Sequence, residues 1–311
     1  MASSEVDQKF LGRLARAVEY ENPLLSSMLF KILGLSLNLA EQLIATKRQR
    51  RPDPSQAYSF LKRVVHILWL SREGLIMLQQ YVIPMIGHYV ELKVLAYKLR
   101  ASFFHIFVLF HNQPPVSEMA RWYPELLAAV AAAASGDRER AANHANPETL
   151  SRPPSIQPTH PLEGGPVCPP PGFESLDHLL RPALLLPLKD YLPKAHDYFK
   201  VAVALADELL WGSHSLRLSV KTEYAAFLYD CAHDANASRT LARETIAEVY
   251  DATEGMDDDM FRDACELVTV LGKMVTRGIG NDKLPSQGKG PMAKAPASLQ
   301  SIPPLGMENP I

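Results

Sequence analysis

The feature that most constrains this chain is a run of amphipathic helical patterns between Ala195 and Arg277. Within it, the segment His214–Cys231 repeats apolar side chains three and four positions apart, which places them on one face of an α-helix. They are Leu216, Val220, Tyr224, Phe227, Leu228 and Cys231. Similar stripes predict a helix before this segment, Ala195–Trp211, and two helices after it. Turns such as Ala232–Ala237 are short, and helices joined by short turns pack as antiparallel neighbours.

The N-terminal half of the chain also has a helical pattern. Apolar faces predict four helices here, and an alanine-rich segment predicts a fifth because alanine is the best helix former. The ranges are Asp7–Tyr20, Leu24–Thr46, Tyr58–Ile83, Val90–His111 and Leu126–Ala142. No alternating run bounded by turn residues predicts a strand. The fold class is therefore all-α, an antiparallel helical bundle.

Proline divides the chain, because it removes a backbone donor and blocks helix interiors. Of the 25 prolines, many fall in the segment 146–192, which is predicted to be a linker or long loop. A shorter break, Asn112–Pro115, ends a helix, and the segment 278–311 lacks periodicity and is predicted to be disordered. The predicted organisation is 1–145 and 193–277 as helical parts, 146–192 as an insertion and 278–311 as a tail.

Composition narrows the class of protein. A formal charge of −2 from 32 basic and 34 acidic side chains gives no general attraction to nucleic acid or anionic membranes. The longest apolar stretches, Ile32–Thr46 and Ala101–His111, are shorter than the roughly 18 residues that a spanning helix needs. The first residues lack the pattern of a secretory signal, and three cysteines make no disulfide framework. These observations predict a cytoplasmic or nuclear protein without a nucleic-acid or membrane partner.

No catalytic motif is present in the sequence. It lacks a phosphate-binding glycine-rich loop, a nucleophile elbow and a zinc-binding histidine pair. His105 and His111 are predicted to be interior histidines, and Cys231 and Cys265 to be core residues. Asp257–Asp259 are predicted to cap the last helix, with a cation site as the alternative, although the glycine of a calcium loop is missing. The sequence thus predicts neither an enzyme nor a cofactor or metal site.

The basic run at the end of the second predicted helix has two interpretations. Lys47, Arg48, Arg50 and Arg51 precede Pro52, which stops the helix. Such a run is most often a solvated helix end, and the alternative is a binding patch.

Several segments resemble the 14-3-3 family. The segment His214–Asp230, reading HSLRLSVKTEYAAFLYD, is similar to a family helix, and the similarity continues in register through Leu241-Ala-Arg243 to Phe261–Cys265. Upstream, Ala195–Lys200 resembles the family's preceding helix. Further N-terminal segments also resemble the family, namely Gln8-Lys9, Tyr20-Glu21, Leu24–Ser26, Phe30-Lys31, Val82–Pro84, Glu91–Val94, Lys98 and Ser135–Arg138.

The resemblance implies an antiparallel bundle that dimerises through its N-terminal helices. It also implies a groove that binds a phosphoserine or phosphothreonine peptide through arginine, lysine and tyrosine. One N-terminal helix of the family is predicted to be missing, because the stretch from Tyr20 to Pro84 is short for it. Two segments, His111–Glu125 and Asn146–Leu192, are predicted to be insertions. A homodimer or heterodimer stays open for this chain.

Matching the family's groove residue by residue gives a set of candidate positions. The family's lysines match Lys31 and Lys98, while an arginine falls on Leu37 or Asn38 and the arginine–tyrosine pair falls on His105 and Ile106. The peptide-holding asparagines fall on Glu223 and Met274, and the apolar wall falls on Leu267 and Val270. The candidate groove residues are Lys31, Asn38, Lys98, His105, Glu223, Leu267, Val270 and Met274.

These replacements predict weak phosphate recognition, since each charge-assisted hydrogen bond contributes roughly 1.5–3 kcal/mol and Glu223 would repel an anion. The preferred prediction is an adapter that binds protein or peptide clients with this recognition degraded. The alternatives are a conventional phosphopeptide-binding regulator, an unrelated helical repeat scaffold and an enzyme.

Overall fold

The computed structural model describes residues 4–48, 57–118, 120–122, 187 and 189–278. The chain divides into a unit at Met1–Thr276 and a second unit at Arg277–Ile311, and every helix described below belongs to the first. The predicted helix Leu126–Ala142 and most of the segments 146–192 and 278–311 lie outside the described residues.

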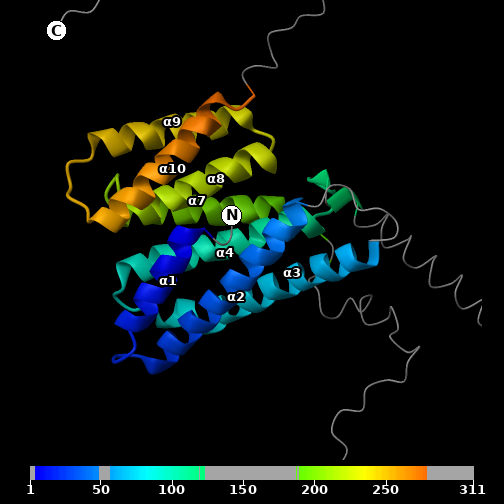
Figure 1. Cartoon of the computed structure of the whole chain (residues 1–311), viewed down its shortest axis with the longest axis horizontal. Helices are drawn as coiled ribbons and strands as arrows, with labels where there is room; N and C mark the ends of the chain where they lie inside the picture. Colours follow the sequence, from blue (N-terminus) through cyan, green and yellow to red (C-terminus); the bar gives the residue numbers. More distant parts are fainter. Residues whose placement is uncertain (1–3, 49–56, 119, 123–186, 188, 279–311) are drawn as a thin grey trace, which may run out of the picture. The chain divides into compact units, whose positions relative to one another are not determined.

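The described part of the first unit is a helical bundle without a β-strand (Figure 1). This confirms the all-α prediction. In chain order the α-helices are α1 (Glu5–Ala17), α2 (Pro23–Arg48), α3 (Ala57–Met77), α4 (Val90–His111), α7 (Leu192–Leu209), α8 (Ser215–Asp230), α9 (Ala235–Asp251) and α10 (Asp258–Thr276). Helices α1 to α4 contact one another in sequence, as do α7 to α10, and α4 packs along α7 to join the two groups.

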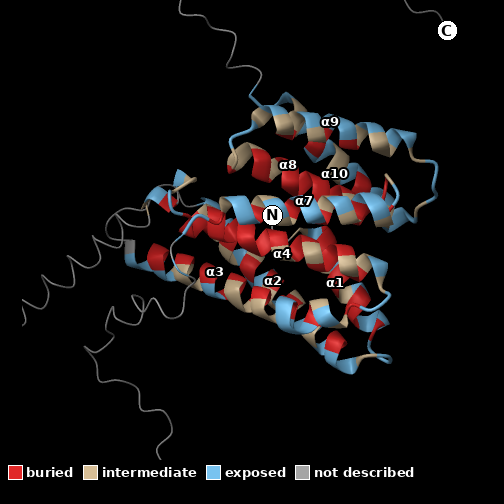
Figure 2. Cartoon of the chain, turned by 180° about the vertical axis from the view of Figure 1, so that it is seen from behind, coloured by how far each residue is buried: buried red, intermediate tan, exposed pale blue. Residues whose placement is uncertain are grey.

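Helix α4 is the centre of this bundle. Its buried residues occupy every side of the helix, and from Ala101 to Val108 all eight side chains are buried (Figure 2). A helix that is apolar all round is stable only when neighbours enclose it. Helices α1, α3, α7 and α8 contact it and provide that enclosure.

Helix starts agree with the capping chemistry in the sequence. The side chain of Asp257 accepts a hydrogen bond from the backbone N–H of Met260 at 2.7 Å, which confirms its predicted capping role. His214 caps α8 in the same way through Nδ1, which accepts from the N–H of Leu216 at 3.2 Å. Helix α7 starts at Leu192, earlier than predicted, because Pro193 is well suited to a first helical turn.

Helix α3 is shorter than the predicted Tyr58–Ile83 helix. The α-helical pattern ends at Met77, and a π-helical turn (Leu78–Val82) and a 3-10 turn (Ile83–Met85) follow. Pro84 explains the change, because its ring cannot donate to the preceding turn and clashes with it.

Two further predictions need correction or comment. Cys231 is buried as predicted, whereas Cys265 is exposed, because Ala264 and Leu271 form the buried face of α10 and Cys265, the residue after Ala264, is turned about 100° away from it. Helix α2 is also long and apolar enough, by length and composition alone, to cross a membrane, with 33% of its most apolar window buried. Unbroken apolar runs in the sequence do not reveal the full length of this apolar helix. Core helices of soluble proteins meet the same criteria of length and composition, so α2 alone assigns no location.

Asn112 connects the segment before residues 123–186 to the segment after them. Its amide nitrogen donates to Asp190 Oδ1 at 3.0 Å, and its amide oxygen accepts from the N–H of Tyr191 at 2.6 Å. The N–H of Gln113 donates to the carbonyl oxygen of Lys189 at 3.1 Å. The end of α4 is therefore attached directly to the start of α7.

Helices α3 and α4 approach each other closely at Gly74. A Cβ atom built there would lie 2.5 Å from Cζ of Phe103, whose ring is fully buried and cannot move aside. We expect Gly74→Ala to destabilise the protein by about 1–3 kcal/mol through overpacking, as measured by denaturant unfolding. Gly34→Ala in α2 is the matched control, since nothing lies within 4 Å of its Cβ position. That variant should gain about 0.5–1 kcal/mol from helix propensity, and an equal gain at Gly74 would refute the packing argument.

Candidate functional site

A buried lysine of α4, Lys98, contacts residues of both α1 and α8. The side chain of Lys98 is 0% exposed, and its Nζ forms an ion pair with the carboxylate of Asp7 on α1. Nζ also donates to the hydroxyl of Ser219 on α8 at 2.6 Å and lies 3.4 Å from the hydroxyl of Ser4. All of its hydrogen-bonding capacity is directed into the protein.

A carboxylate extends this network along α8. Glu223 is 2% exposed at its side chain, and its Oε2 lies 3.6 Å from Nζ of Lys98. The hydroxyl of Ser102 donates to the same oxygen at 2.8 Å, while the other oxygen faces Nδ1 of His105 at 3.5 Å. Burial alone would raise the pKa of Glu223. Nearby positive charge, including that of Lys98, and the contact with His105 have a larger effect and lower this pKa well below its usual value. Glu223 is therefore ionised.

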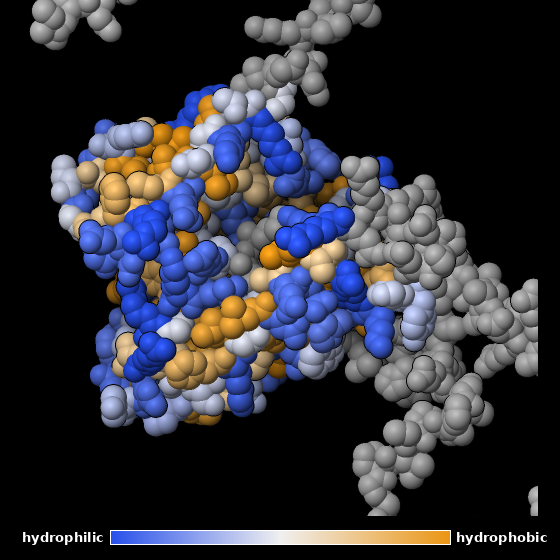
Figure 3. Space-filling view, viewed as in Figure 1, coloured by the Kyte–Doolittle hydropathy of each residue, from blue (hydrophilic) through white to orange (hydrophobic). Residues whose placement is uncertain are grey.

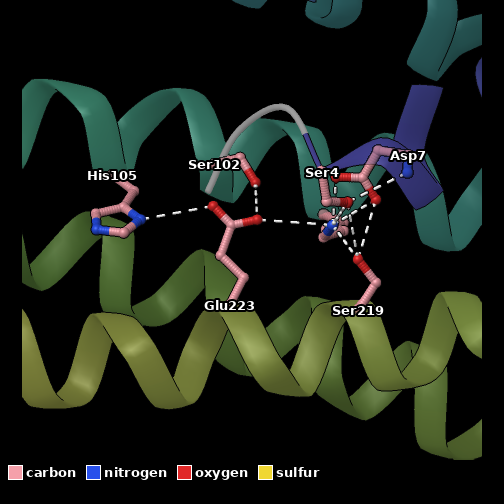
Figure 4. Close-up of polar contacts among 7 residues, drawn as sticks. Ser4, Asp7, Ser102, His105, Ser219 and Glu223 are labelled. Atoms are coloured by element: carbon pink, nitrogen blue, oxygen red, sulfur yellow. Dashed lines mark hydrogen bonds and ion pairs between the residues drawn. The ribbon is translucent and has the colours of Figure 1, made fainter. Parts of the chain in front are cut away.

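Helical spacing brings these groups together. On α4, Ser102 lies one turn after Lys98, and His105 lies two turns after Lys98. The three side chains therefore share one face of the helix. Glu223 follows Ser219 by one turn on α8 and opposes them. The network consists of Ser4, Asp7, Lys98, Ser102, His105, Ser219 and Glu223 (Figure 4).

A second polar cluster supports the same three helices near the start of α4. Glu91 accepts a hydrogen bond from Arg13 of α1 at 2.7 Å and lies 3.3 Å from Nε2 of His214, the cap of α8. The hydrogen bond with His214 is the main cause that lowers the pKa of Glu91. Charged contacts thus hold α1, α4 and α8 together at two places, around Lys98 and around Glu91.

An apolar cavity of about 380 Å³ lies next to His105, near the C-terminal ends of α2, α4 and α8. We call it the α4 cavity. Its apolar walls come from Leu43, Ile106, Leu109, Phe110, Val116, Trp122 and Ala226, and its polar lining from Lys47, His105, Ser117, Glu118, Asp230 and His233. The segment after α4, predicted to be an insertion, provides one wall. Its Trp122 packs against Phe60 of α3 with ring centroids 6.5 Å apart.

The structure brings together three of the predicted groove residues, in a different setting from the one expected. Lys98 and Glu223 lie in the interior, with no exposed side-chain surface to offer a ligand, and His105 is 3% exposed at the edge of the α4 cavity. The correction has a clear physical reason. Asp7 supplies Lys98 with a partner inside the bundle, which makes its burial possible.

The other predicted groove residues lie apart from this network. Lys31 lines a shallow depression between α1 and α2, to which α4, α8 and α10 contribute no residue. The other lining residues are Glu19, Pro23, Ser26, Ser27 and Phe30. Asn38 is exposed on α2. Leu267, Val270 and Met274 follow one another on α10, where Leu267 and Met274 are half-buried and Val270 is 39% exposed.

Comparisons with known proteins give no identification. No family model matches the chain, and no curated protein matches it. Within the described residues, no group of three or more histidine, cysteine or acidic side chains could hold a metal ion.

Sequence reasoning missed Asp7, Ser102 and Ser219 as partners of Lys98. A signal was present, because Ser219 and Glu223 interrupt the apolar residues of α8 at a spacing of one turn. Polar residues one turn apart on an otherwise enclosed helix indicate partners on a facing helix. No sequence signal could have located the α4 cavity, because its walls come from segments far apart in the chain.

Removal of Lys98 should be costly, because it leaves two carboxylates without their buried counter-ion. We expect Lys98→Ala to lower the free energy of unfolding by about 3–5 kcal/mol, as measured by urea denaturation. The control is Lys62→Ala on α3, an exposed lysine whose loss should change stability by less than about 0.5 kcal/mol. A similar small effect at Lys98 would contradict the central role of this ion pair.

Acid should destabilise the protein in part through Glu223. Because its pKa is lowered in the folded state, its contribution is complete above the unfolded carboxyl pKa of about 4.3 and is lost as pH falls below it. We expect the urea midpoint of the natural protein to drop more steeply between pH 7 and pH 3 than that of Glu223→Gln. Parallel curves for the two proteins would show that Glu223 does not provide this dependence.

Proposed function

We propose that this chain is a 14-3-3-like adapter that binds protein partners and has lost most of its phosphate recognition. The proposal rests on the resemblance between His214 and Cys265, and the helical bundle is consistent with it. Helices α8, α9 and α10 follow one another with short turns, as the resemblance requires. It assigns the protein to the binding modules and not to the enzymes.

The observation that carries the loss of phosphate recognition is the burial of Lys98. A phosphate site needs cations that face the ligand, and guanidinium groups bind phosphate best because they donate two parallel hydrogen bonds. Here the charge of Lys98 is paired internally, and the position next to His105 is Ile106, which is 2% exposed. The ionised carboxylate of Glu223, 3.6 Å from Nζ of Lys98, offsets the charge of the lysine further.

Exposed apolar side chains provide surface for protein partners. Val270 is exposed on α10 beside half-buried Leu267 and Met274. Helix α2 exposes further large apolar residues, namely Leu24, Phe30, Leu37 and Ile44, and Figure 3 shows apolar surface over this helix. Apolar patches of this kind are typical of interaction sites. We propose that α10 contacts client peptides and that α2 is available to a second chain, in a homodimer or a heterodimer.

The proposal predicts that partner binding does not depend on phosphorylation. The full chain is used to capture partners from a lysate, with half of the lysate treated with phosphatase beforehand. We expect the same partners in both halves, whereas a loss of partners after phosphatase treatment would favour a conventional phosphopeptide-binding regulator.

A charge on α10 should prevent capture if clients bind there. Val270→Glu places a carboxylate in the proposed client surface and should abolish partner capture in both halves of the lysate. Tyr250→Glu on α9, a residue that is 79% exposed, is the matched control and should leave capture unchanged. Normal capture by Val270→Glu would remove α10 from the proposed client surface.

A further inference from the structure

The α4 cavity has the size and lining of a pocket for one large side chain. Ligand pockets usually have volumes of roughly 300–1,000 Å³, and this one, at about 380 Å³, lies at the small end. Its apolar lining includes Ile106, Leu109 and Phe110 of α4, together with Leu43 of α2 and Ala226 of α8. Such a lining favours an aromatic or aliphatic group over a charged one.

One polar atom lies at the edge of this apolar lining. His105 directs Nδ1 toward Glu223, and because an ionised carboxylate only accepts hydrogen bonds, this contact favours the tautomer that carries the proton on Nδ1. The other ring nitrogen, Nε2, is buried and has no hydrogen-bond partner among the described residues. Buried polar atoms of this kind normally have a partner.

The direction of this nitrogen matches the position of the cavity. Figure 4 shows that Nε2 points away from Glu223, along α4 and α8 toward their C-terminal ends. The cavity residues Leu109 and Ala226 lie in that direction, one turn beyond His105 on α4 and nearly one turn beyond Glu223 on α8. The cavity therefore lies on the side of the ring that carries Nε2.

The charges around the cavity disfavour an anionic ligand. Its polar lining includes Lys47, Glu118 and Asp230, which sum to a formal charge of −1 when His105 and His233 are neutral. The buried carboxylate of Glu223 lies behind His105. A phosphate group would meet net negative charge here, so the ligand group is expected to be uncharged.

We propose that the α4 cavity receives the side chain of an unphosphorylated tyrosine from a partner peptide, with its hydroxyl paired to Nε2 of His105. The phenol ring fills the apolar part of the cavity. Its hydroxyl can donate to Nε2 of a neutral histidine and can accept from Nε2 of a protonated one. This inference rests on the proposed adapter function and names the chemistry that its clients would present.

The first test selects ligands without assuming their sequence. A random library of unphosphorylated peptides displayed on phage is panned against the full chain, and the selected peptides are sequenced. We expect tyrosine at one fixed position of the selected peptides. Selection of peptides without tyrosine would overturn this inference but leave the adapter function in place, whereas selection of no peptide would count against the adapter function as well.

The second test measures the contribution of the hydroxyl by titration calorimetry on the natural protein. We expect the phenylalanine analogue of a selected peptide to bind about 2- to 10-fold more weakly, the effect of one neutral hydrogen bond. The phosphotyrosine analogue should bind at least about 10-fold more weakly because of its charge. Equal affinity of the tyrosine and phenylalanine peptides, or tighter binding of the phosphotyrosine peptide, would overturn the pairing with His105.

The third test blocks the cavity without changing the charge network. Ala226→Phe fills the cavity from α8 and should reduce binding of the selected peptide at least about 10-fold. Ala247→Phe on the exposed face of α9 is the matched control and should bind normally. Unchanged binding by a folded Ala226→Phe variant would place the peptide elsewhere. If that variant fails to fold, the comparison of the two peptides on the natural protein still decides the question.

Discussion

The ion pair between Lys98 and Asp7 is the interaction on which the rest of this bundle depends. Two opposite charges can be buried only when each provides the other with a partner and the remaining hydrogen bonds are made. Ser219 and Ser102 complete that requirement, and together these side chains attach α1 and α8 to the central helix α4. The N-terminal helix therefore belongs to the same core as the C-terminal helices, although it is far from them in sequence.

The same ion pair also affects the charged groups next to it. A lysine that is committed to Asp7 and Glu223 has no charge to offer a phosphate, and the ionised Glu223 in turn orients His105. One nitrogen of the histidine faces Glu223, and the other has no hydrogen-bond partner among the described residues. His105 is the residue that the polar network and the α4 cavity share.

Much of the fold could be predicted from the sequence, because it depends on local patterns. The stripe in α8, the aspartate cap of α10 and the all-α class all follow from spacing and capping chemistry within single helices. The end of α3 at Met77 was missed, because Pro84 disturbs the helix over more than one turn. The site was predicted only in part: Lys98, His105 and Glu223 were identified, but their burial depends on Asp7, which is 91 residues from Lys98. Such pairings are set by tertiary packing, which single-helix patterns do not contain.

The attachment of α4 to α7 through Asn112 has a consequence for how this chain can change during evolution. Residues 123–186 join two segments of the chain that Asn112 and Gln113 already hold together. The entropic cost of closing a loop between fixed ends grows slowly with its length, by about 0.6 kcal/mol for each doubling. A change in the number of residues between these two fixed segments therefore carries only a small cost in loop-closure entropy, while Asn112 and Gln113 keep α4 attached to α7.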